Sequence, residues 1–353
     1  MQKNVLFITR KWPPAVGGME TYCVELTDAL KLHVNLSVEA LPGRDDGTPP
    51  STFNLIVFGL RSLVSLFGPR QSYDIIHGAD MAIWPLVLAT SLRTPGAKVV
   101  LSAHGSDVAF ANRPGFLPFL YRHYLQLGAR LTKKAVVIAN SHATALLLER
   151  HSFNNPIVVP LAAKSVSPNT QPPQQYILFV GRLTKQKGCQ WFIENVLPAL
   201  PDEISLRVVG PVIDRSEEAP LATPRVIYHG PAHGEKLTEL RSRALVVIVP
   251  NIDTEETYFE GFGLAATEAA AAGSVTLASN VYGLRDAVID QCTGYLLPSN
   301  QPEAWVDKIQ EIAKWTPNQR ESFITASMIK TTEFFSWDRV AHDTVAAYGG
   351  HVR

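Results

Sequence analysis

The sequence contains little cysteine and no long apolar segment. Cys23, Cys189 and Cys292 are its only cysteines among 353 residues, and they lack the CxxC spacing that is typical of zinc sites. The longest charge-free apolar stretch, residues 269–284, holds 16 residues, fewer than the roughly 20 that a membrane-spanning helix needs. The apolar run that follows residue 4 is too short for a signal peptide. We therefore expect a cytoplasmic protein in a reducing compartment that crosses no membrane.

The sequence also lacks an excess of charge of either sign. Lys+Arg and Asp+Glu both number 32, which excludes the overall cationic field of a protein that coats nucleic acid. The balance is uneven along the chain, because residues 1–168 hold 16 basic and 10 acidic side chains, a net charge of +6. These cations form either a solvated helix face or a surface that meets anionic lipid head groups or a phosphorylated acceptor. Leu, Phe and Tyr residues lie between these cations in the sequence. The cations are Arg61, Arg70, Arg113, Arg122, Arg130, Lys133 and Lys134.

Short apolar runs alternate with helical patterns along most of the chain. This alternation is typical of βαβ units and parallel sheets. The expected strands are 5–9, 74–77, 98–103, 135–139 and 157–159, then 176–180, 206–209, 226–228, 245–249 and 275–278. A polar, proline-rich segment at 164–175 separates the two sets and is the expected linker.

The fold class predicted from this pattern is α/β, with two doubly wound Rossmann-like domains that face an interdomain cleft. The domains are expected at 1–168 and 169–336, with a helix near 337–353 that packs back on the first. Ligands of open α/β sheets bind at the carboxyl ends of the strands, so the candidate residues are those that follow strands.

In the first domain, two strand ends carry candidate residues. Gly17 and Gly18 lie at a strand-to-helix turn, where backbone N–H groups and the helix dipole favour a phosphate; such a pair is also common in plain turns. His104 and Asp107 lie just past the strand 98–103. Their alternative role is that of a satisfied core histidine and its partner, but position at a strand end favours function.

In the second domain, cations and paired carboxylates follow the strands. Gly181, Arg182 and Lys187 lie on one short loop. The two cations are spaced in a pattern suited to binding a diphosphate. Glu260 and Glu268 flank a glycine turn whose N–H groups form an anion nest, and two carboxylates can grip two ends of a nucleotide-sugar. Solvated cations and helix-dipole complements are the alternatives. The nest comprises Phe262, Gly263 and Leu264.

Other familiar sites lack their sequence signatures. No GxGxxG, Walker A or GxSxG motif occurs, which removes the main support for dinucleotide, P-loop and hydrolase-triad interpretations. His229 and His233 are four apart, but Gly230 and Pro231 disfavour the helix that would align them as metal ligands. We expect neither a metal nor a cofactor.

Taken together, these motifs resemble those of the retaining GT-B glycosyltransferases of family 4 (glycosyltransferase group 1), from residue 5 to about 300. The motifs are Pro13-Pro14…Gly17-Gly18, His104-Gly105-x-Asp107, Asn140-Ser141, Gly181-Arg182…Lys187-Gly188 and Glu260…Glu268 with Phe262-Gly263-Leu264. The resemblance implies that Glu268 holds the nucleotide ribose and Glu260 the hydroxyls of the transferred sugar. It further implies that Arg182 and Lys187 neutralise the diphosphate, that Gly18 borders the phosphate or acceptor, and that His104 faces the reacting carbon.

The implied reaction is metal-independent transfer from a UDP- or GDP-sugar to a hydroxyl, with retention at the anomeric carbon. The expected acceptor is a lipid-linked saccharide of polysaccharide or lipopolysaccharide assembly, with possible peripheral contact to an anionic membrane. A soluble acceptor is the alternative. A sugar-nucleotide epimerase and a non-catalytic nucleotide-sugar sensor are the competing classes.

Overall fold

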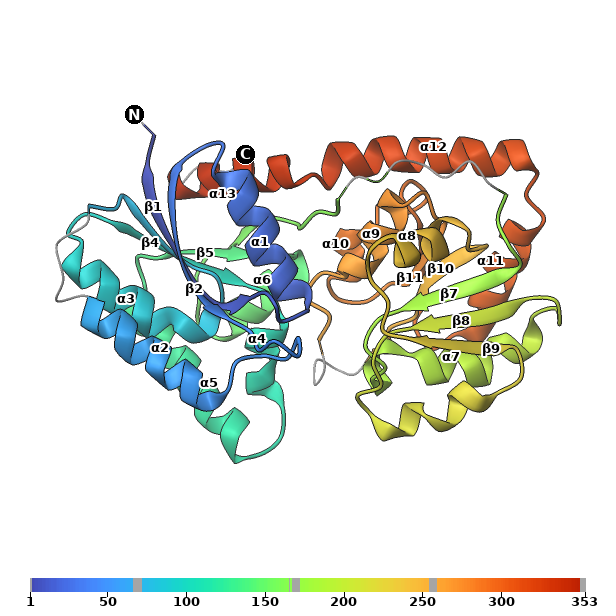
Figure 1. Cartoon of the computed structure of the whole chain (residues 1–353), viewed down its shortest axis with the longest axis horizontal. Coiled ribbons are helices and arrows are strands. Elements are labelled where there is room, and N and C mark those ends of the chain that lie inside the picture. Colours follow the sequence, from blue (N-terminus) through green and yellow to red (C-terminus); the bar gives the residue numbers. More distant parts are fainter. Residues whose placement is uncertain (1, 66–71, 165, 167–171, 254–258, 350–353) are drawn as a thin grey trace. The chain divides into compact units, whose positions relative to one another are not determined.

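The computed structural model describes residues 2–65, 72–164, 166, 172–253 and 259–349, with only the backbone for residues 61–65. The chain forms two compact units. The first comprises residues 1–161, 257–261 and 337–353, and the second comprises residues 162–256 and 262–336. Each unit is a single parallel sheet of six strands with helices packed against it (Figure 1). The predicted class, two doubly wound α/β domains, is confirmed.

The first sheet has the strand order β2-β1-β3-β4-β5-β6. Its central strands are almost fully buried, as expected for apolar runs that helices cover on both faces. The strands are β1 (Asn4–Trp12), β2 (Asn35–Pro42), β3 (Ile75–Gly78), β4 (Lys98–Ala103), β5 (Val136–Ala139) and β6 (Ile157–Val158). The helices are α1 (Gly18–Leu30), α2 (Thr52–Ser65), α3 (Trp84–Arg93), α4 (Ser106–Ala109), α5 (Phe116–Leu131), α6 (His142–Arg150) and α13 (Trp337–Gly349).

Helix α13 comes from the far end of the chain and packs on α1 within the first unit. Its buried face includes Val340, Ala341 and Tyr348. Its polar contacts include that of His33 with the carboxylate of Asp338 at 3.2 Å and the hydrogen bond that Arg339 donates to the backbone carbonyl of Leu161 at 3.2 Å. The end of the chain thereby completes the core of the first unit.

The second sheet has the order β12-β11-β10-β7-β8-β9. Trp305 is fully buried in its main core, together with Phe179 and Phe192. The strands are β7 (Tyr176–Val180), β8 (Ser205–Val209), β9 (Val226–Gly230), β10 (Val246–Val249), β11 (Thr276–Ser279) and β12 (Tyr295–Leu297). The helices are α7 (Cys189–Asn195), α8 (Gly234–Ser242), α9 (Leu264–Ala271), α10 (Leu284–Ala287), α11 (Pro302–Ala313) and α12 (Pro317–Phe334).

Both strand orders reverse direction at one point. In the first sheet β2 and β3 lie on opposite sides of β1, and in the second sheet β8 and β10 lie on opposite sides of β7. At such a switch point the loops after neighbouring strands diverge and leave a crevice at the carboxyl edge. The ends of β1 and β3, and those of β7 and β10, are therefore where each unit is expected to bind a ligand.

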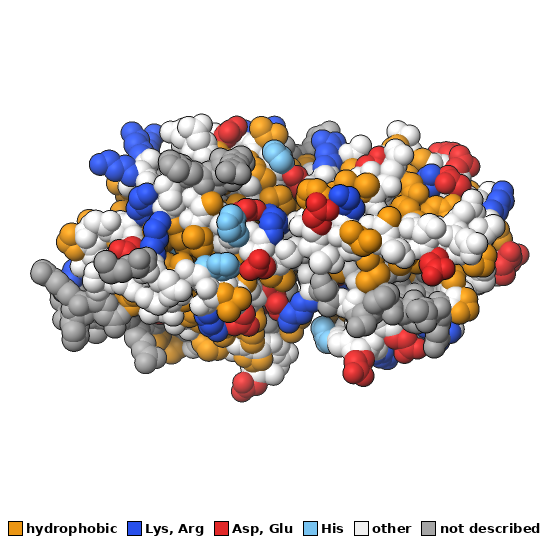
Figure 2. Space-filling view, turned by 90° about the horizontal axis from the view of Figure 1, so that it is seen from above, with side chains coloured by type: hydrophobic (Ala, Val, Ile, Leu, Met, Phe, Trp, Pro, Cys, Tyr) orange, Lys and Arg blue, Asp and Glu red, His pale blue; other side chains and the backbone are white. Residues whose placement is uncertain are grey.

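The outer surface is of mixed character. On the face shown in Figure 2, side chains of both charge signs alternate with hydrophobic ones. In the part of the chain that the structure describes, no helix has the combined length and apolarity needed to cross a membrane.

Candidate functional site

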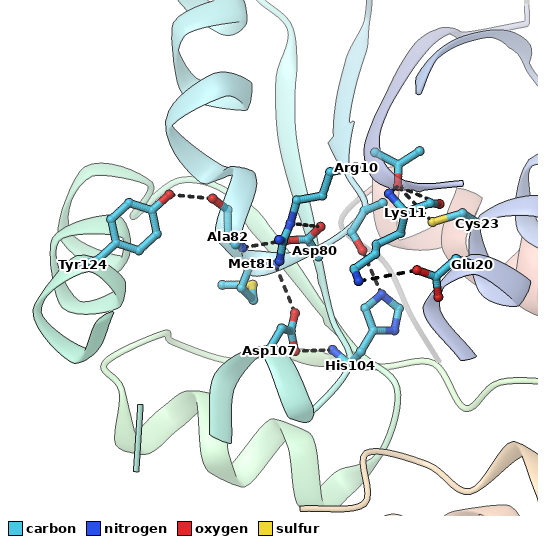
Figure 3. Close-up of polar contacts among 12 residues, drawn as sticks. Arg10, Lys11, Glu20, Cys23, Asp80, Met81, Ala82, His104, Asp107 and Tyr124 are labelled. Atoms are coloured by element: carbon cyan, nitrogen blue, oxygen red, sulfur yellow. Dashed lines mark hydrogen bonds and ion pairs between the residues drawn. The ribbon is translucent and has the colours of Figure 1, made fainter. Parts of the chain in front are cut away.

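The glycine turn after β1 begins α1, as the sequence predicts. Gly17 is the residue before the helix, and Gly18 is its first residue. An anion of the chain itself lies at this turn: a Cβ on Gly17 would come within 2.6 Å of the Glu20 carboxylate. Glu20 is buried, and its carboxylate lies 3.4 Å from the ammonium nitrogen of Lys11. Lys11 and Glu20 thus border the Gly17–Gly18 turn with one charge of each sign (Figure 3).

His104 follows β4 and is buried against the end of β3. Its Nε2 lies 2.8 Å from the carbonyl oxygen of Ala79. Because a carbonyl can only accept, Nε2 must donate a proton in this contact. The Tyr22 ring packs edge-on against the imidazole, with centroids 4.4 Å apart. His104 is therefore held in one orientation.

Asp107 supports the backbone around His104. Its carboxylate accepts hydrogen bonds from the backbone N–H of His104 at 2.9 Å and of Met81 at 3.1 Å. Burial is the largest influence on this carboxyl, and it raises the pKa of Asp107 above its ordinary value. The side chain ties the loop after β4 to the loop after β3 (Figure 3).

Sequence reasoning missed the pair formed by Arg10 and Asp80. Asp80 is fully buried at the end of β3, and its two carboxylate oxygens accept from Arg10 Nε at 3.1 and 3.2 Å. It also accepts from the backbone N–H of Ala82 at 2.8 Å. The signal was present, because Arg10 lies near the end of β1 and Asp80 lies two residues after β3, at the carboxyl edge where ligands of such sheets bind. Arg10, Asp80 and His104 thus gather three polar groups at one edge of the first sheet (Figure 3).

The segment that carries Glu260 packs into the same edge. Gly261 lies so close to the loop after β4 that a Cβ there would be 1.8 Å from the His104 carbonyl oxygen. Gly105, with φ +81°, leaves room for this approach, since a Cβ on it would be 2.6 Å from the Gly261 Cα. Thr144 also donates to the Gly261 carbonyl at 3.3 Å. The structure thus brings Glu260, through the backbone of its neighbour, next to His104.

In the second unit, the predicted cations follow β7. Gly181 continues the sheet, because its N–H donates to the carbonyl of Val209 at 3.0 Å. The Arg182 side chain is exposed, and Lys187 is half-buried in a short 3₁₀ turn, residues 185–187. Both cations therefore lie on the loop at the carboxyl end of β7, next to the switch point of this sheet.

The predicted anion nest precedes α9 in the same unit. Gly263 has φ +106° directly before the helix, a left-handed conformation that glycine adopts without strain. Phe262 is buried and Leu264 begins α9. Glu268 lies one turn further along, with a third of its side chain exposed.

Arg241 of α8 is a partner of Glu268 that no sequence pattern indicates. Its guanidinium forms an ion pair with the Glu268 carboxylate, while only 10% of the Arg241 side chain is exposed. The Arg241 carbonyl in turn accepts from the Ser274 hydroxyl at 2.7 Å. Since 27 residues separate the two partners, no local pattern connects them. The contact fixes the direction in which Glu268 leaves its helix.

A buried polar chain runs beneath the first site. His77 Nδ1 lies 2.8 Å from the Tyr348 hydroxyl, and His77 Nε2 lies 2.8 Å from the Ser102 hydroxyl. Ser102 also contacts the hydroxyl of Tyr22 at 2.7 Å, and Tyr22 packs on His104. This series of contacts therefore links α13 to His104, a candidate catalytic residue.

Burial lowers the pKa of His77 from 6.5 to about 3. The unfolded chain takes up this proton below about pH 6.5, whereas the folded protein does not until about pH 3. The free energy of unfolding should therefore fall as pH decreases through this window, by roughly 1 kcal/mol per pH unit from this group. Urea unfolding of His77→Gln between pH 7 and 4 should show a shallower slope. His342→Gln, which removes an exposed histidine, should keep the wild-type slope; equal slopes for all three proteins would contradict the assignment.

Among the described residues, no three His, Cys, Asp or Glu side chains gather as metal ligands. His229 ends β9 and His233 precedes α8, so they share no helix. The acidic segment at 254–258 lies outside the described residues.

Two family models match separate parts of the chain. The model described as Glycosyltransferase Family 4 matches residues 16–160, and the model described as Glycosyl transferases group 1 matches residues 174–314. The first range includes the loops around Gly18 and His104. The second includes Arg182, Lys187 and the two glutamates.

Individual proteins resemble the chain over about half of its length or over nearly all of it. The D-inositol 3-phosphate glycosyltransferase of Xylanimonas cellulosilytica is 32% identical over 182 residues, which are 49% of this chain and 41% of that protein. The chain therefore spans less than half of this relative's length. HepE of Anabaena, solved with UDP and glucose, has a TM-score of 0.70 at 15% identity and matches 99% of this chain and 100% of its own. WaaG, a glycosyltransferase involved in lipopolysaccharide biosynthesis, has a TM-score of 0.67 at 17% identity, with 98% and 100% covered.

Proposed function

The chain belongs to glycosyltransferase family 4 (group 1), with the GT-B architecture of two Rossmann-like domains, and from this premise we propose that it transfers a sugar with retention from a UDP- or GDP-sugar to a hydroxyl acceptor. The observation that carries the proposal is the pair of glutamates around the Phe262–Leu264 turn. Glu260 adjoins a residue packed on His104, and Glu268 is ion-paired with Arg241. HepE, which shares the fold, binds UDP and glucose.

In the proposed reaction, the bond between the anomeric carbon and the diphosphate breaks as the acceptor oxygen bonds to the same face. Negative charge accumulates on the departing diphosphate, and Arg182, Lys187 and the N–H groups before α9 stabilise it. No metal is required, because these cations and dipoles replace it. The leaving phosphate oxygen takes the acceptor proton, and Glu260 and His104 orient the transferred sugar.

The proposed acceptor is a lipid-linked saccharide. Helices α2 and α5 of the first unit expose large hydrophobic side chains, including Phe53, Leu60, Phe116 and Leu117. Residues 108–148 contain no Asp or Glu, so an apolar and basic surface covers α5, as expected for contact with an anionic membrane. A soluble acceptor is the alternative, since the relative from Xylanimonas is named for inositol 3-phosphate.

Donor identity and reaction class can be measured together. A thermal-shift screen of UDP-, GDP- and ADP-sugars should find one donor that raises Tm. With that donor, free nucleotide diphosphate plus a glycoside that retains the anomeric configuration is the expected product. An altered sugar nucleotide alone would indicate an epimerase, and binding without turnover for every acceptor would indicate a sensor; either result overturns the proposal.

Arg241→Gln should weaken donor binding through Glu268. Without its cation, the Glu268 carboxylate loses its fixed direction, so we expect the Kd of the donor to rise about tenfold, corresponding to about 1.4 kcal/mol. The matched control is Arg243→Gln, which removes a nearby arginine that pairs with Glu239 in α8 instead. Calorimetric titration of both variants measures the effect. Equal donor affinity in the two variants would show that Arg241 does not position Glu268.

The protein should bind vesicles that contain anionic lipid at low salt. Binding should weaken strongly when ionic strength rises from about 0.05 to 0.5 M, because screening shortens the reach of surface charge. Flotation with anionic and with zwitterionic vesicles measures this. No binding to anionic vesicles at low salt would remove the membrane from the proposal, and the soluble acceptor would then stand.

A further inference from the structure

An open cavity of about 370 Å³ lies in the first unit and is lined by residues of α2, α3 and α5. Its volume falls within the range of small-molecule sites, roughly 300–1,000 Å³. The wall is mostly apolar: Leu55, Phe58 and Gly59 come from α2, and Leu86 comes from α3. Neither the nucleotide-sugar chemistry nor the buried polar chain uses this space.

The polar groups of the cavity are Arg10 and Tyr124. The Tyr124 hydroxyl already donates to the Ala82 carbonyl at 2.5 Å. Arg10 is anchored only through Nε, by Asp80, and 27% of its side chain is exposed. Among the described residues, no hydrogen bond engages its two terminal nitrogens. The cavity therefore has apolar walls and one fixed cation, which lies at the carboxyl edge of the sheet.

Helix α2 connects this cavity to the outer surface. Its inner side lines the cavity, while Phe53, Ile56 and Leu60 are more than half exposed on its outer side. A helix that is apolar on both sides is usually buried in protein or lipid, and α2, with 14 residues, is too short to span a bilayer. Residues 47–73 contain no acid. Helix α2 thus presents apolar side chains both to the cavity and to the outer surface.

We propose that this cavity takes up the hydrocarbon chain of a lipid-linked acceptor. The chain would lie between α2 and α3, with the polar head beside Arg10 and therefore on the His104 side of the sheet. This inference rests on the proposed function, and it adds a binding site for the lipid portion of the acceptor. The proposed occupant is the hydrocarbon chain of the acceptor itself, because the anchored Arg10 cation lies where the acceptor's head group must enter the reaction site.

Alkyl β-glucosides of six to twelve carbons, used below their critical micelle concentrations, test the cavity directly. Burial of each methylene should tighten binding about fourfold, until the chain fills the space. Gly59→Phe should abolish this dependence, because a side chain at Gly59 meets nothing within 4 Å and would occupy the open volume. Gly59→Ala adds one methyl group and should keep the dependence. Calorimetric titration measures affinity, and unchanged Tm shifts with the donor show that each variant is folded.

A second variant separates the cavity from the membrane surface. Leu60→Ser changes the outer face of α2, so it should weaken vesicle binding and leave the glucoside series unchanged. Failure of the proposed function would appear as no transfer in any protein, with the glucoside series intact. Equal chain-length dependence in wild type and Gly59→Phe, or none in wild type, would overturn the cavity proposal even in an active transferase.

Discussion

Lys187→Ala should lower kcat by about 100-fold or more and change the Kd of the donor far less. The reason is that charge on the diphosphate oxygens grows as the glycosidic bond breaks, so a cation beside them stabilises the transition state more than the bound donor. Lys187 lies in the turn after β7, at the switch point of the second sheet. Arg182→Ala should have an effect of the same kind, because Arg182 follows the same strand.

The matched control is Lys185→Ala. Lys185 lies in the same 3₁₀ turn, but its side chain is exposed. Its backbone N–H donates to the Asp214 carboxylate at 2.9 Å, a contact that needs no Lys185 side chain. Single-turnover rates at saturating donor, compared with donor titrations, separate the rate effect from the binding effect. Wild-type rates in both Arg182→Ala and Lys187→Ala would remove these cations from the mechanism. An equal loss of kcat in Lys185→Ala would show that the effect comes from general surface charge and is not specific to Lys187.

The strands that the sequence predicts well are those buried on both faces. Runs such as 98–103 and 176–180 coincide with β4 and β7, because continuous burial demands continuous apolar residues. Strand β2 was missed because Asn35–Pro42 lies at an edge, is largely half-buried or exposed, and carries Asn, Ser and Glu. Strand β12 was missed because it has three residues. An edge position relaxes the pattern on which the prediction depends.

The candidate site shows the same division. Residues that follow a strand directly, such as His104 and Arg182, could be found because parallel strands present their carboxyl ends at one edge. Arg10, near the end of β1, and Asp80, two residues after β3, lie at the same edge and were overlooked. Arg241 obeys no local rule, since it lies in α8 and meets Glu268 of α9 only in the folded chain. Tyr22 likewise meets His104 only because α1 packs on the sheet. Contacts between elements that are distant in sequence depend on the fold. No pattern in a single sequence marks the residues that make them.

Gly261→Ala should lower kcat by at least about 100-fold without unfolding the second unit. The added Cβ would lie 1.8 Å from the His104 carbonyl oxygen and 2.7 Å from its carbon. Both are backbone atoms, so they cannot rotate away as a side chain would. Either the Glu260 segment or the loop after β4 must move, and a displacement of about 1 Å at a reacting centre costs about 100-fold in rate.

Donor affinity distinguishes this displacement from general damage. Arg182, Lys187 and Glu268 belong to the second unit, so the Kd for the free nucleotide diphosphate should stay within about threefold of wild type in Gly261→Ala. Gly349→Ala, at a position with no atom within 4 Å of the new Cβ, is the matched control in the first unit and should retain full kcat. Wild-type turnover in Gly261→Ala would show that the backbone tolerates the methyl group and that the approach of Glu260 to His104 is not needed for transfer.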